Sequence, residues 1–271
     1  MFTIGTSSEV IKSYELKEAI DLLARNGYRA IEIWMNRFSK KSINLKSIKK
    51  QLHDSGLKYR IHVDARDINL TSNNQGIREE SFFQTLNAIR LASQLEAPVV
   101  TFHPGKMSST KDIISEFQDM QIDTIGNLTS HAEKYGVILG MENMEKRPKE
   151  IFMDLSEIKL LFDKIKSPNL GLTLDLAHYH SVGNLLDFVN QLDTPVVNVH
   201  ISQASPSKMH LPLTSSDDGI INFSEILSAL HQKYHGPLII EGYVQGKEEE
   251  TIRTNINWLQ HCLCDLRLVS I

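Results

Sequence analysis

The sequence has little cysteine, no long apolar run and no large excess of charge of either sign. Its two cysteines, Cys262 and Cys264, are two positions apart in an apolar C-terminal segment, and side chains at that spacing point to different faces of a helix. We therefore expect neither a disulfide nor a metal site from this pair, as is typical of a reducing, cytoplasmic setting.

The charge and the apolar pattern exclude further classes of protein. A formal net charge of −4 excludes a strongly basic, histone-like surface. No apolar run is long enough to cross a membrane. The N-terminus MFTIG begins directly as a strand, without the basic and apolar segments of an export signal. We expect a protein that neither enters a membrane nor is exported.

Short apolar or β-branched runs alternate with amphipathic stretches along the whole chain. Eight strands, each joined to the next by a helix, are expected to be parallel and to close into a (β/α)8 TIM barrel, an α/β fold, with 1–271 as one domain. An open doubly wound sheet usually carries a glycine-rich phosphate loop after its first strand, and TSSEVIKS after Gly5 has no such pattern. The predicted strands cover 2–5, 30–34, 59–63, 98–103, 137–142, 170–175, 196–200 and 238–243.

Imidazole and carboxylate side chains end six successive predicted strands. In a TIM barrel, functional residues lie at these C-terminal strand ends and in the loops that follow. Carboxylates gathered at one mouth would repel each other, and a divalent cation is the simplest compensation. Neutral imidazoles and ionised carboxylates suit Zn, Mn, Co or Fe. From the third strand to the eighth, the residues are His62, His103, Glu142, Asp175, His200 and Glu241.

Two more histidines are candidates for the same site. His178 follows Asp175 by three residues in DLAHYH, so both side chains can face one cavity. His210 lies in the long loop after the seventh strand, where a metal ligand and a surface histidine are both open interpretations.

The segments around these strand ends and histidines resemble the xylose isomerase-like TIM barrels. This superfamily contains endonuclease IV and sugar-phosphate isomerases and epimerases. The resemblance covers essentially the whole chain. The motifs that carry it are DINL after His62, FHPG at His103, MEN at Glu142, LDLAH, VNVHIS, HLPL and IIE.

The resemblance to endonuclease IV implies zinc sites that share Glu142 as a bridge. Two residues before His210 that family has an aspartate, whereas this chain has Lys208, which offers no lone pair. The resemblance therefore implies two metal ions and leaves the third site incomplete. The implied ligands are His62, His103 and Glu142 for the first ion, Glu142, Asp175, His200 and Glu241 for the second, and His178 and His210 for the third.

Two chemistries remain open, with Glu142 and Glu241 as the catalytic residues in both. Phosphoester hydrolysis, our first hypothesis, uses two or three metal ions to activate water, and its substrate would be abasic nucleic acid or a small phosphorylated molecule. Isomerisation or epimerisation of a sugar or sugar phosphate needs one metal and an acid–base pair. His62 and His103 would then only orient substrate hydroxyls.

Two predicted mouth loops carry basic residues. MNRFSKKS contains Arg37, Lys40 and Lys41, and MEKRPKE contains Arg147. A solvated surface explains both loops as well as ligand binding does. If they bind a ligand, it is anionic, and Arg37, Arg147 and Lys208 are the candidate substrate-binding residues. The pattern carries no signal for an oligomeric state.

Overall fold

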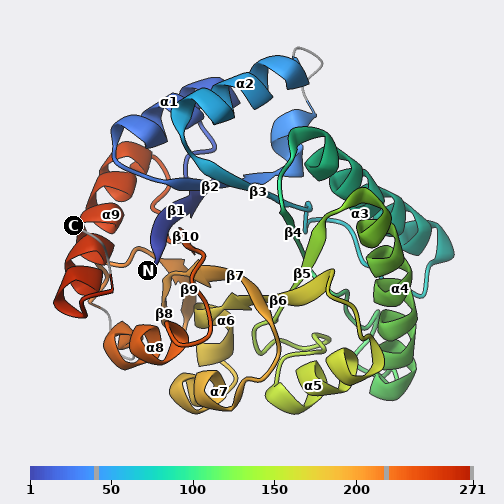
Figure 1. The fold of residues 1–271 in the computed structure, drawn as a ribbon. Coiled ribbons are helices and arrows are strands. Elements are labelled where there is room, and N and C mark those ends of the chain that lie inside the picture. Colours follow the sequence, from blue (N-terminus) through green and yellow to red (C-terminus); the bar gives the residue numbers. More distant parts are fainter. Residues whose placement is uncertain (40–42, 217–219, 269–271) are drawn as a thin grey trace.

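The architecture is a closed barrel of parallel strands surrounded by helices (Figure 1), seen in a computed structural model that describes residues 1–39, 43–216 and 220–268. Around the barrel, each strand pairs with the next in chain order, and the last pairs with the first. This confirms the predicted TIM barrel. In ring order the strands are β1 (Thr3–Ser7), β2 (Ala30–Trp34), β3 (Lys58–His62), β4 (Val99–Phe102), β5 (Ile138–Glu142), β6 (Leu170–Asp175), β7 (Val196–Ile201) and β10 (Pro237–Ile240).

Helices follow the strands and cover the outside of the barrel. Gly56 and Gly136 end two of them in the left-handed conformation, with φ of 68° and 66°, where a residue without Cβ is least strained. The helices are α1 (Leu16–Arg25), the 3-10 helix η1 (Met35–Phe38), α2 (Leu45–Ser55), α3 (Gln75–Leu95), α4 (Ile114–Tyr135), α5 (Leu155–Lys164), α6 (Leu176–His180), α7 (Leu185–Gln191), α8 (Phe223–Leu230) and α9 (Glu248–Asp265).

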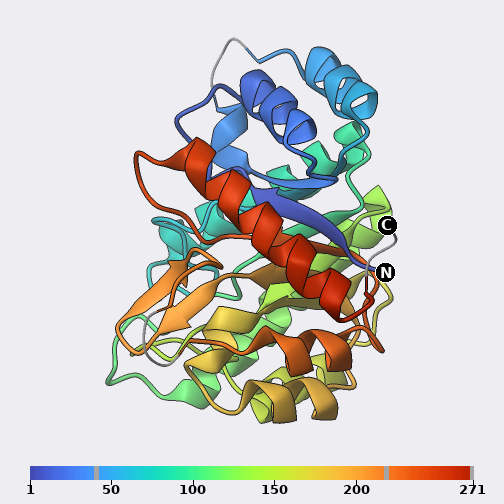
Figure 2. The ribbon, with the colours of Figure 1, turned by 90° about the vertical axis from the view of Figure 1, so that its left-hand side faces the viewer.

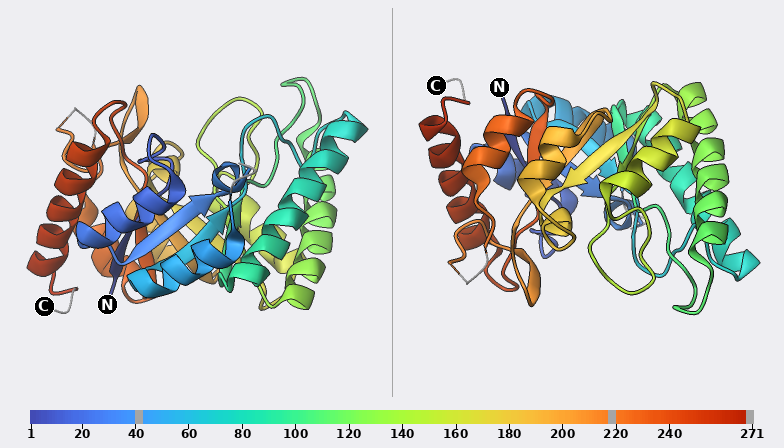
Figure 3. Two further views of the ribbon diagram at one scale, coloured as in Figure 1. Left: turned by 90° about the horizontal axis from the view of Figure 1, so that it is seen from above. Right: turned by 90° about the horizontal axis from the view of Figure 1, so that it is seen from below.

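One element was not expected from the sequence. The predicted loop after β7 contains a small antiparallel hairpin of β8 (Gln203–Ser205) and β9 (Lys208–Leu211). Figures 2 and 3 show this hairpin at the end of the barrel opposite both chain termini, together with the loops after β4 and β10. That end is the mouth, at the carboxyl ends of the strands.

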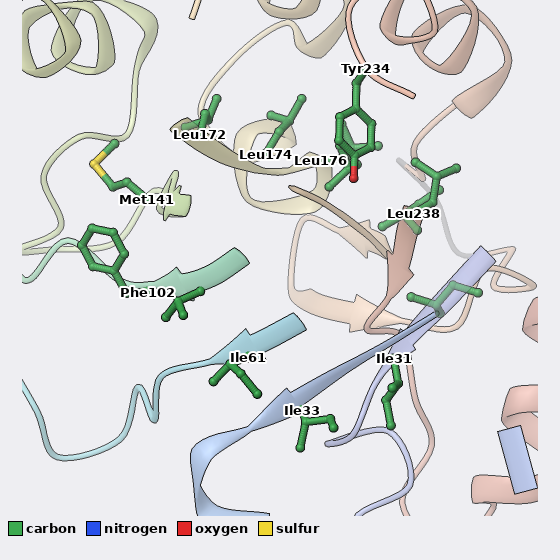
Figure 4. Packing of buried hydrophobic residues seen from close by; sticks show 14 of the residues in the cluster. Ile31, Ile33, Ile61, Phe102, Met141, Leu172, Leu174, Leu176, Tyr234 and Leu238 are labelled. Carbon is green, nitrogen blue, oxygen red and sulfur yellow. The ribbon is translucent and has the colours of Figure 1, made fainter. Parts of the chain in front are cut away.

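The two faces of each strand meet different environments. Ile31 and Ile33 of β2 and Ile61 of β3 project from the ring of strands toward the helices, in the buried apolar layer of Figure 4. Because successive side chains alternate, Glu32 points to the opposite face, into the barrel. Its contacts with Thr101 and Asn198 confirm this placement. The barrel interior beneath the mouth is therefore polar, where TIM barrels usually hold bulky aliphatic side chains.

Two further predictions concern α9 and the membrane. Cys262 and Cys264 are free thiols, as predicted from their spacing. Within the described residues, no helix combines the length and the apolar character needed to cross a membrane.

Close packing between β6 and β7 gives a test of the barrel. A Cβ on Gly171 would lie 2.3 Å from Val197 Cγ1 and 2.9 Å from the Pro195 carbonyl oxygen, so Gly171→Ala should lower the free energy of unfolding by about 1–3 kcal/mol. Gly126, inside α4, has no atom of the described residues within 4 Å of its Cβ position, and Gly126→Ala should raise the free energy of unfolding by about 0.5–1 kcal/mol. Urea denaturation measures both, and equal effects would contradict the packing described.

Candidate metal centre

The structure brings all eight predicted ligand side chains to the mouth of the barrel. They come from the ends of β3 to β7 and β10, from α6 and from β9. Among the described residues, three groups of His, Asp and Glu have ligand atoms within 4.8 Å of one another. The groups are Glu142, Asp175, His200 and Glu241; His62, Glu142 and His200; and Asp175, His178 and His210.

Glu142, the last residue of β5, lies between these histidines. Its Oε2 is 3.3 Å from His62 Nε2 and 3.1 Å from His103 Nε2, and its Oε1 is 3.1 Å from His200 Nδ1. One carboxylate thus contacts imidazoles on both of its oxygens, which is the position predicted for a bridging ligand. His103 is the more peripheral imidazole, since it is 28% exposed and belongs to none of the three groups.

His200, on β7, is oriented from below by a residue that the sequence interpretation did not place in the site. Its Nε2 is 2.6 Å from Glu32 Oε2, and both side chains are fully buried. With its proton on Nε2 and donated to Glu32, the ring presents Nδ1 to Glu142, Glu241 and Asp175, at 3.1, 3.5 and 3.9 Å. A carboxylate behind a metal-binding histidine sets the tautomer in this way.

Asp175 offers the clearest test of whether a cation fits. Its Oδ1 caps α6 by accepting a hydrogen bond from the His178 backbone N–H at 2.7 Å. Asn143 holds the Asp175 backbone on both sides, at 2.8 and 3.0 Å. Oδ2 is buried and has no hydrogen-bond partner in the part of the chain that the structure describes, although it lies 3.9 Å from His200 Nδ1. A buried carboxylate oxygen without a donor is costly, and a bound divalent cation would satisfy it.

His210 reaches the site because two backbones approach closely. A Cβ on Gly242 would lie 2.1 Å from the Leu211 carbonyl oxygen, so only glycine allows the segment after β10 to press against β9. Asn255 of α9 bonds to both segments, through the Gly242 carbonyl and the Leu213 N–H. His210 itself has a φ of 53°, a strained conformation for a residue with a side chain, and its Nδ1 is 3.7 Å from Glu241 Oε2.

The pKa values of the two predicted catalytic glutamates shift in opposite directions. Burial acts to raise the pKa of Glu142, but the imidazoles of His200 and His103 outweigh it and hold this pKa well below its usual value. Burial raises the pKa of Glu241 well above its usual value; His200 opposes this, and the carboxylates of Glu142 and Asp175 add to it. The carboxylates therefore differ in proton affinity although they are close together.

The neighbouring groups follow the same balance of burial and charge. Burial raises the pKa of Asp175 to about 6 and lowers that of His210 to about 4. Burial also acts to lower the pKa of His200, but Glu241, Glu32 and Glu142 raise it well above its usual value. A positive charge at His200 is thus favoured by its surroundings. A divalent cation at Nδ1 would take over this compensating role.

His62 is held in one tautomer beside the cluster. Its Nδ1 donates to the Val63 carbonyl at 2.6 Å, which leaves Nε2 facing Glu142. Its ring stacks on Trp34 at 4.1 Å with an interplanar angle of 5°. Trp34 ends β2, so this strand supplies both the wall beside His62 and the carboxylate beneath His200.

The predicted substrate-binding residues are more dispersed. Arg37 donates to the carbonyls of Lys12 and Tyr14, so it braces the loop after β1, and its role in substrate binding stays a prediction without support from this geometry. Arg147 and Lys208 line one cavity beside the metal-ligand cluster. Lys40 and Lys41 lie outside the described residues.

Glu32 is the main residue that sequence reasoning missed. A signal was present, because AIEIW places a carboxylate inside a strand that a TIM barrel buries on both sides. Period-two alternation assigns Glu32 to the face opposite Ile31 and Ile33, which is the barrel interior. The partner of that carboxylate depends on the register between strands, and the sequence does not contain it.

Comparison with known proteins agrees with this architecture. A family profile described as xylose isomerase-like TIM barrel matches residues 20–262. The chain belongs to this family, as its motifs predicted.

Individual relatives differ in how much of the chain they match. The chain is similar to protein MJ1311 of Methanocaldococcus jannaschii, at 28% identity over 88% of this chain and 82% of the relative. An inosose isomerase of Halalkalibacterium halodurans is 24% identical over 65% and 63%. A probable endonuclease 4 of Mycoplasma mobile is 31% identical over 40% and 39%.

A solved structure shows the same fold over nearly the whole chain. A D-tagatose 3-epimerase-like protein superposes with a TM-score of 0.86, covering 98% of each chain at 24% identity.

The contact between Glu32 and His200 can be tested by metal affinity. We expect Glu32→Gln to weaken zinc binding about 10–100-fold, because an amide no longer selects the His200 tautomer that presents Nδ1. Glu225→Gln, which changes an exposed glutamate of α8, is the matched control and should bind zinc as the wild type does. Chelator competition gives the dissociation constants, and circular dichroism verifies folding. Equal affinity in wild type and Glu32→Gln would refute the orienting role.

Proton competition at Asp175 predicts how metal binding depends on pH. A carboxyl group with a pKa of about 6 is ionised above that pH and protonated below it, so zinc affinity should be high at pH 7.5 and fall as the pH drops below about 6. Asp175→Asn should bind zinc more weakly at pH 7.5 and show a flatter dependence on pH. An affinity that is constant between pH 7.5 and 5 would contradict this assignment.

Proposed function

We propose that this protein is a metal-dependent isomerase or epimerase that acts on a small polyhydroxylated carbonyl compound, a sugar or a sugar phosphate. The observation that carries the proposal is the group formed by Glu142, Asp175, His200 and Glu241, whose ligand atoms lie within 4.8 Å of one another. This donor set is a complete single-metal site of carboxylates and an imidazole, suited to Zn, Mn, Co or Fe.

In this proposal each side chain of the group has a defined task. A divalent ion held there would polarise adjacent oxygens of the substrate. Glu142 and Glu241 move the proton: one carboxylate takes it from a substrate carbon while the other gives a proton back. Asp175 and His200 complete the donor set, and Glu32 holds the His200 ring in place. Trp34 and His62 form a wall that keeps solvent from this side of the site.

The cavity next to Glu241 supports a small, polar substrate. Its volume is about 180 Å³, below the roughly 300–1,000 Å³ of pockets for drug-sized ligands. The aromatic rings of Trp34 and Tyr243 supply flat walls, and charged groups supply hydrogen bonds to hydroxyls. The lining residues are Ser7, Glu9, Lys12, Trp34, Arg66, His210, Glu241 and Tyr243.

The names of the relatives agree with this ranking. The D-tagatose 3-epimerase-like structure covers 98% of the chain, and the inosose isomerase aligns with 65% of it. The probable endonuclease 4 aligns with 40%. Sugar isomerisation, the second hypothesis from the sequence, therefore becomes the first.

Phosphoester hydrolysis is the second candidate because of one specific observation. His62 and His103 both approach the Oε2 atom of Glu142, whereas His200 approaches Oε1. These two imidazoles with Glu142 are the donors expected for a second metal, which hydrolysis would use and isomerisation would not need.

Metal stoichiometry and two variants separate these candidates. We expect one metal ion per chain by elemental analysis, and two or three would favour hydrolysis. In assays with a panel of sugars and sugar phosphates, Glu241→Gln should lose about 10²–10⁴-fold in turnover, because the acid–base pair is broken. His103→Ala should retain most of its turnover. Loss of all activity in His103→Ala, together with cleavage of an abasic-site oligonucleotide by the wild type, would reverse the ranking.

A further inference from the structure

A second cavity lies beside the metal-ligand cluster, with a volume of about 490 Å³. Three segments enclose it: the loop after β5, the end of α6 and the β8–β9 hairpin. Its lining residues are Glu145, Lys146, Arg147, His180, Ser181, Ala204, Ser205, Pro206, Ser207, Lys208 and Met209.

The lining is positively charged although the chain as a whole is acidic. Lys146, Arg147 and Lys208 contribute three cations, and Glu145 contributes one carboxylate. That carboxylate is already paired with Arg147, at 2.8 Å. Among the described residues, the lining therefore carries a net charge of +2, in a chain with a net charge of −4. Lysine and arginine side chains with serine hydroxyls nearby are the groups that bind phosphate.

The segments that line the cavity also carry residues of the metal-ligand cluster. Lys208 and His210 are two residues apart on β9, but the positive φ of His210 and an irregularity in the β8–β9 pairing interrupt the alternation of side chains. Lys208 lines the cavity, whereas His210 lies 3.7 Å from Glu241. On the opposite wall, Ser181 Oγ donates to the His178 carbonyl at 2.6 Å and accepts the Lys146 N–H at 2.8 Å. The rings of His178 and His210, which both belong to the cluster, meet edge to face at 5.2 Å.

We propose that this cavity is an anion subsite that binds the phosphate monoester of the substrate, with Lys208 and Lys146 as its main cations. The proposal rests on the proposed function and narrows its substrate class to a phosphorylated polyhydroxylated carbonyl compound. The carbon to be isomerised lies at the metal-ligand cluster, and the phosphate lies beyond His178 and His210. The proposal also explains Lys208. This lysine stands where the resemblance implies an aspartate ligand of the third metal, and here it supplies a cation to the neighbouring cavity instead.

Binding of inorganic phosphate tests the subsite directly. Calorimetric titration at low ionic strength, against a chloride control, should show phosphate binding to the purified protein. The double variant Lys208→Ala/Lys146→Ala, which leaves the Arg147–Glu145 pair intact, should bind phosphate at least 10-fold more weakly. Lys166→Ala changes a lysine that pairs with Asp163 at another cavity, and it should bind phosphate as the wild type does. Elemental analysis should give the same metal content in all three proteins. Unchanged phosphate affinity in the double variant, or no binding by the wild type, would overturn the subsite.

Kinetics separate a failure of the subsite from a failure of the proposed function. A phosphorylated substrate whose KM rises in the double variant with little change in kcat supports both proposals. If phosphate binds at these residues but no sugar phosphate is turned over, the subsite stands and the isomerase proposal is refuted. If free sugars are converted as fast as their phosphates and the double variant has no effect on either, the subsite is refuted and the isomerase proposal stands. The protein could instead bind an abasic-site oligonucleotide more tightly than phosphate monoesters. If the double variant loses that binding, the assignment to a small phosphorylated substrate is overturned.

Discussion

Four carboxylates surround one imidazole, that of His200, and the rest of the mouth depends on keeping these charges compensated. Glu32 contacts Nε2, while Glu142, Glu241 and Asp175 approach Nδ1. Buried carboxylates at such distances destabilise a fold unless positive charge is shared among them. A protonated imidazole and a bound divalent cation are alternative sources of that charge at the same atom, so proton and metal occupancy are linked.

The barrel interior is built to hold this arrangement. Thr101 Oγ1 and Asn198 Nδ2 both donate to Glu32 Oε1, and Thr101 also contacts Thr173. These polar residues occupy positions where a TIM barrel interior usually holds aliphatic side chains, and they donate hydrogen bonds to the buried carboxylate of Glu32. Stability comes from the other face of the strands, where the apolar side chains of Figure 4 pack against the helices. Because the apolar core lies on the outer face of the strands, the barrel interior can hold charged side chains without removing apolar residues from that core.

The β8–β9 hairpin connects the cluster to the neighbouring cavity. It brings His210 against Glu241 through the close contact at Gly242, and it directs Lys208 to the cavity that Arg147 also lines. One short element thus contributes to both the metal-ligand group and the proposed phosphate subsite. Strain at His210 is maintained because Asn255 fixes the two backbones on either side.

The sequence by itself determined the barrel, its strand positions to within about three residues, and the eight side chains that meet at its mouth. It could do so because alternation of short strands with amphipathic helices is a local signal, and parallel strands necessarily bring their carboxyl ends to one edge. Only the tertiary structure decided that Glu32 contacts His200, that Asp175 Oδ2 has no hydrogen-bond partner among the described residues, that Arg37 braces a loop, and that Lys208 lines a separate cavity. These facts depend on strand register, on the hairpin after β7 and on the approach of distant backbones, and such contacts between residues far apart in the chain leave no pattern in a single sequence.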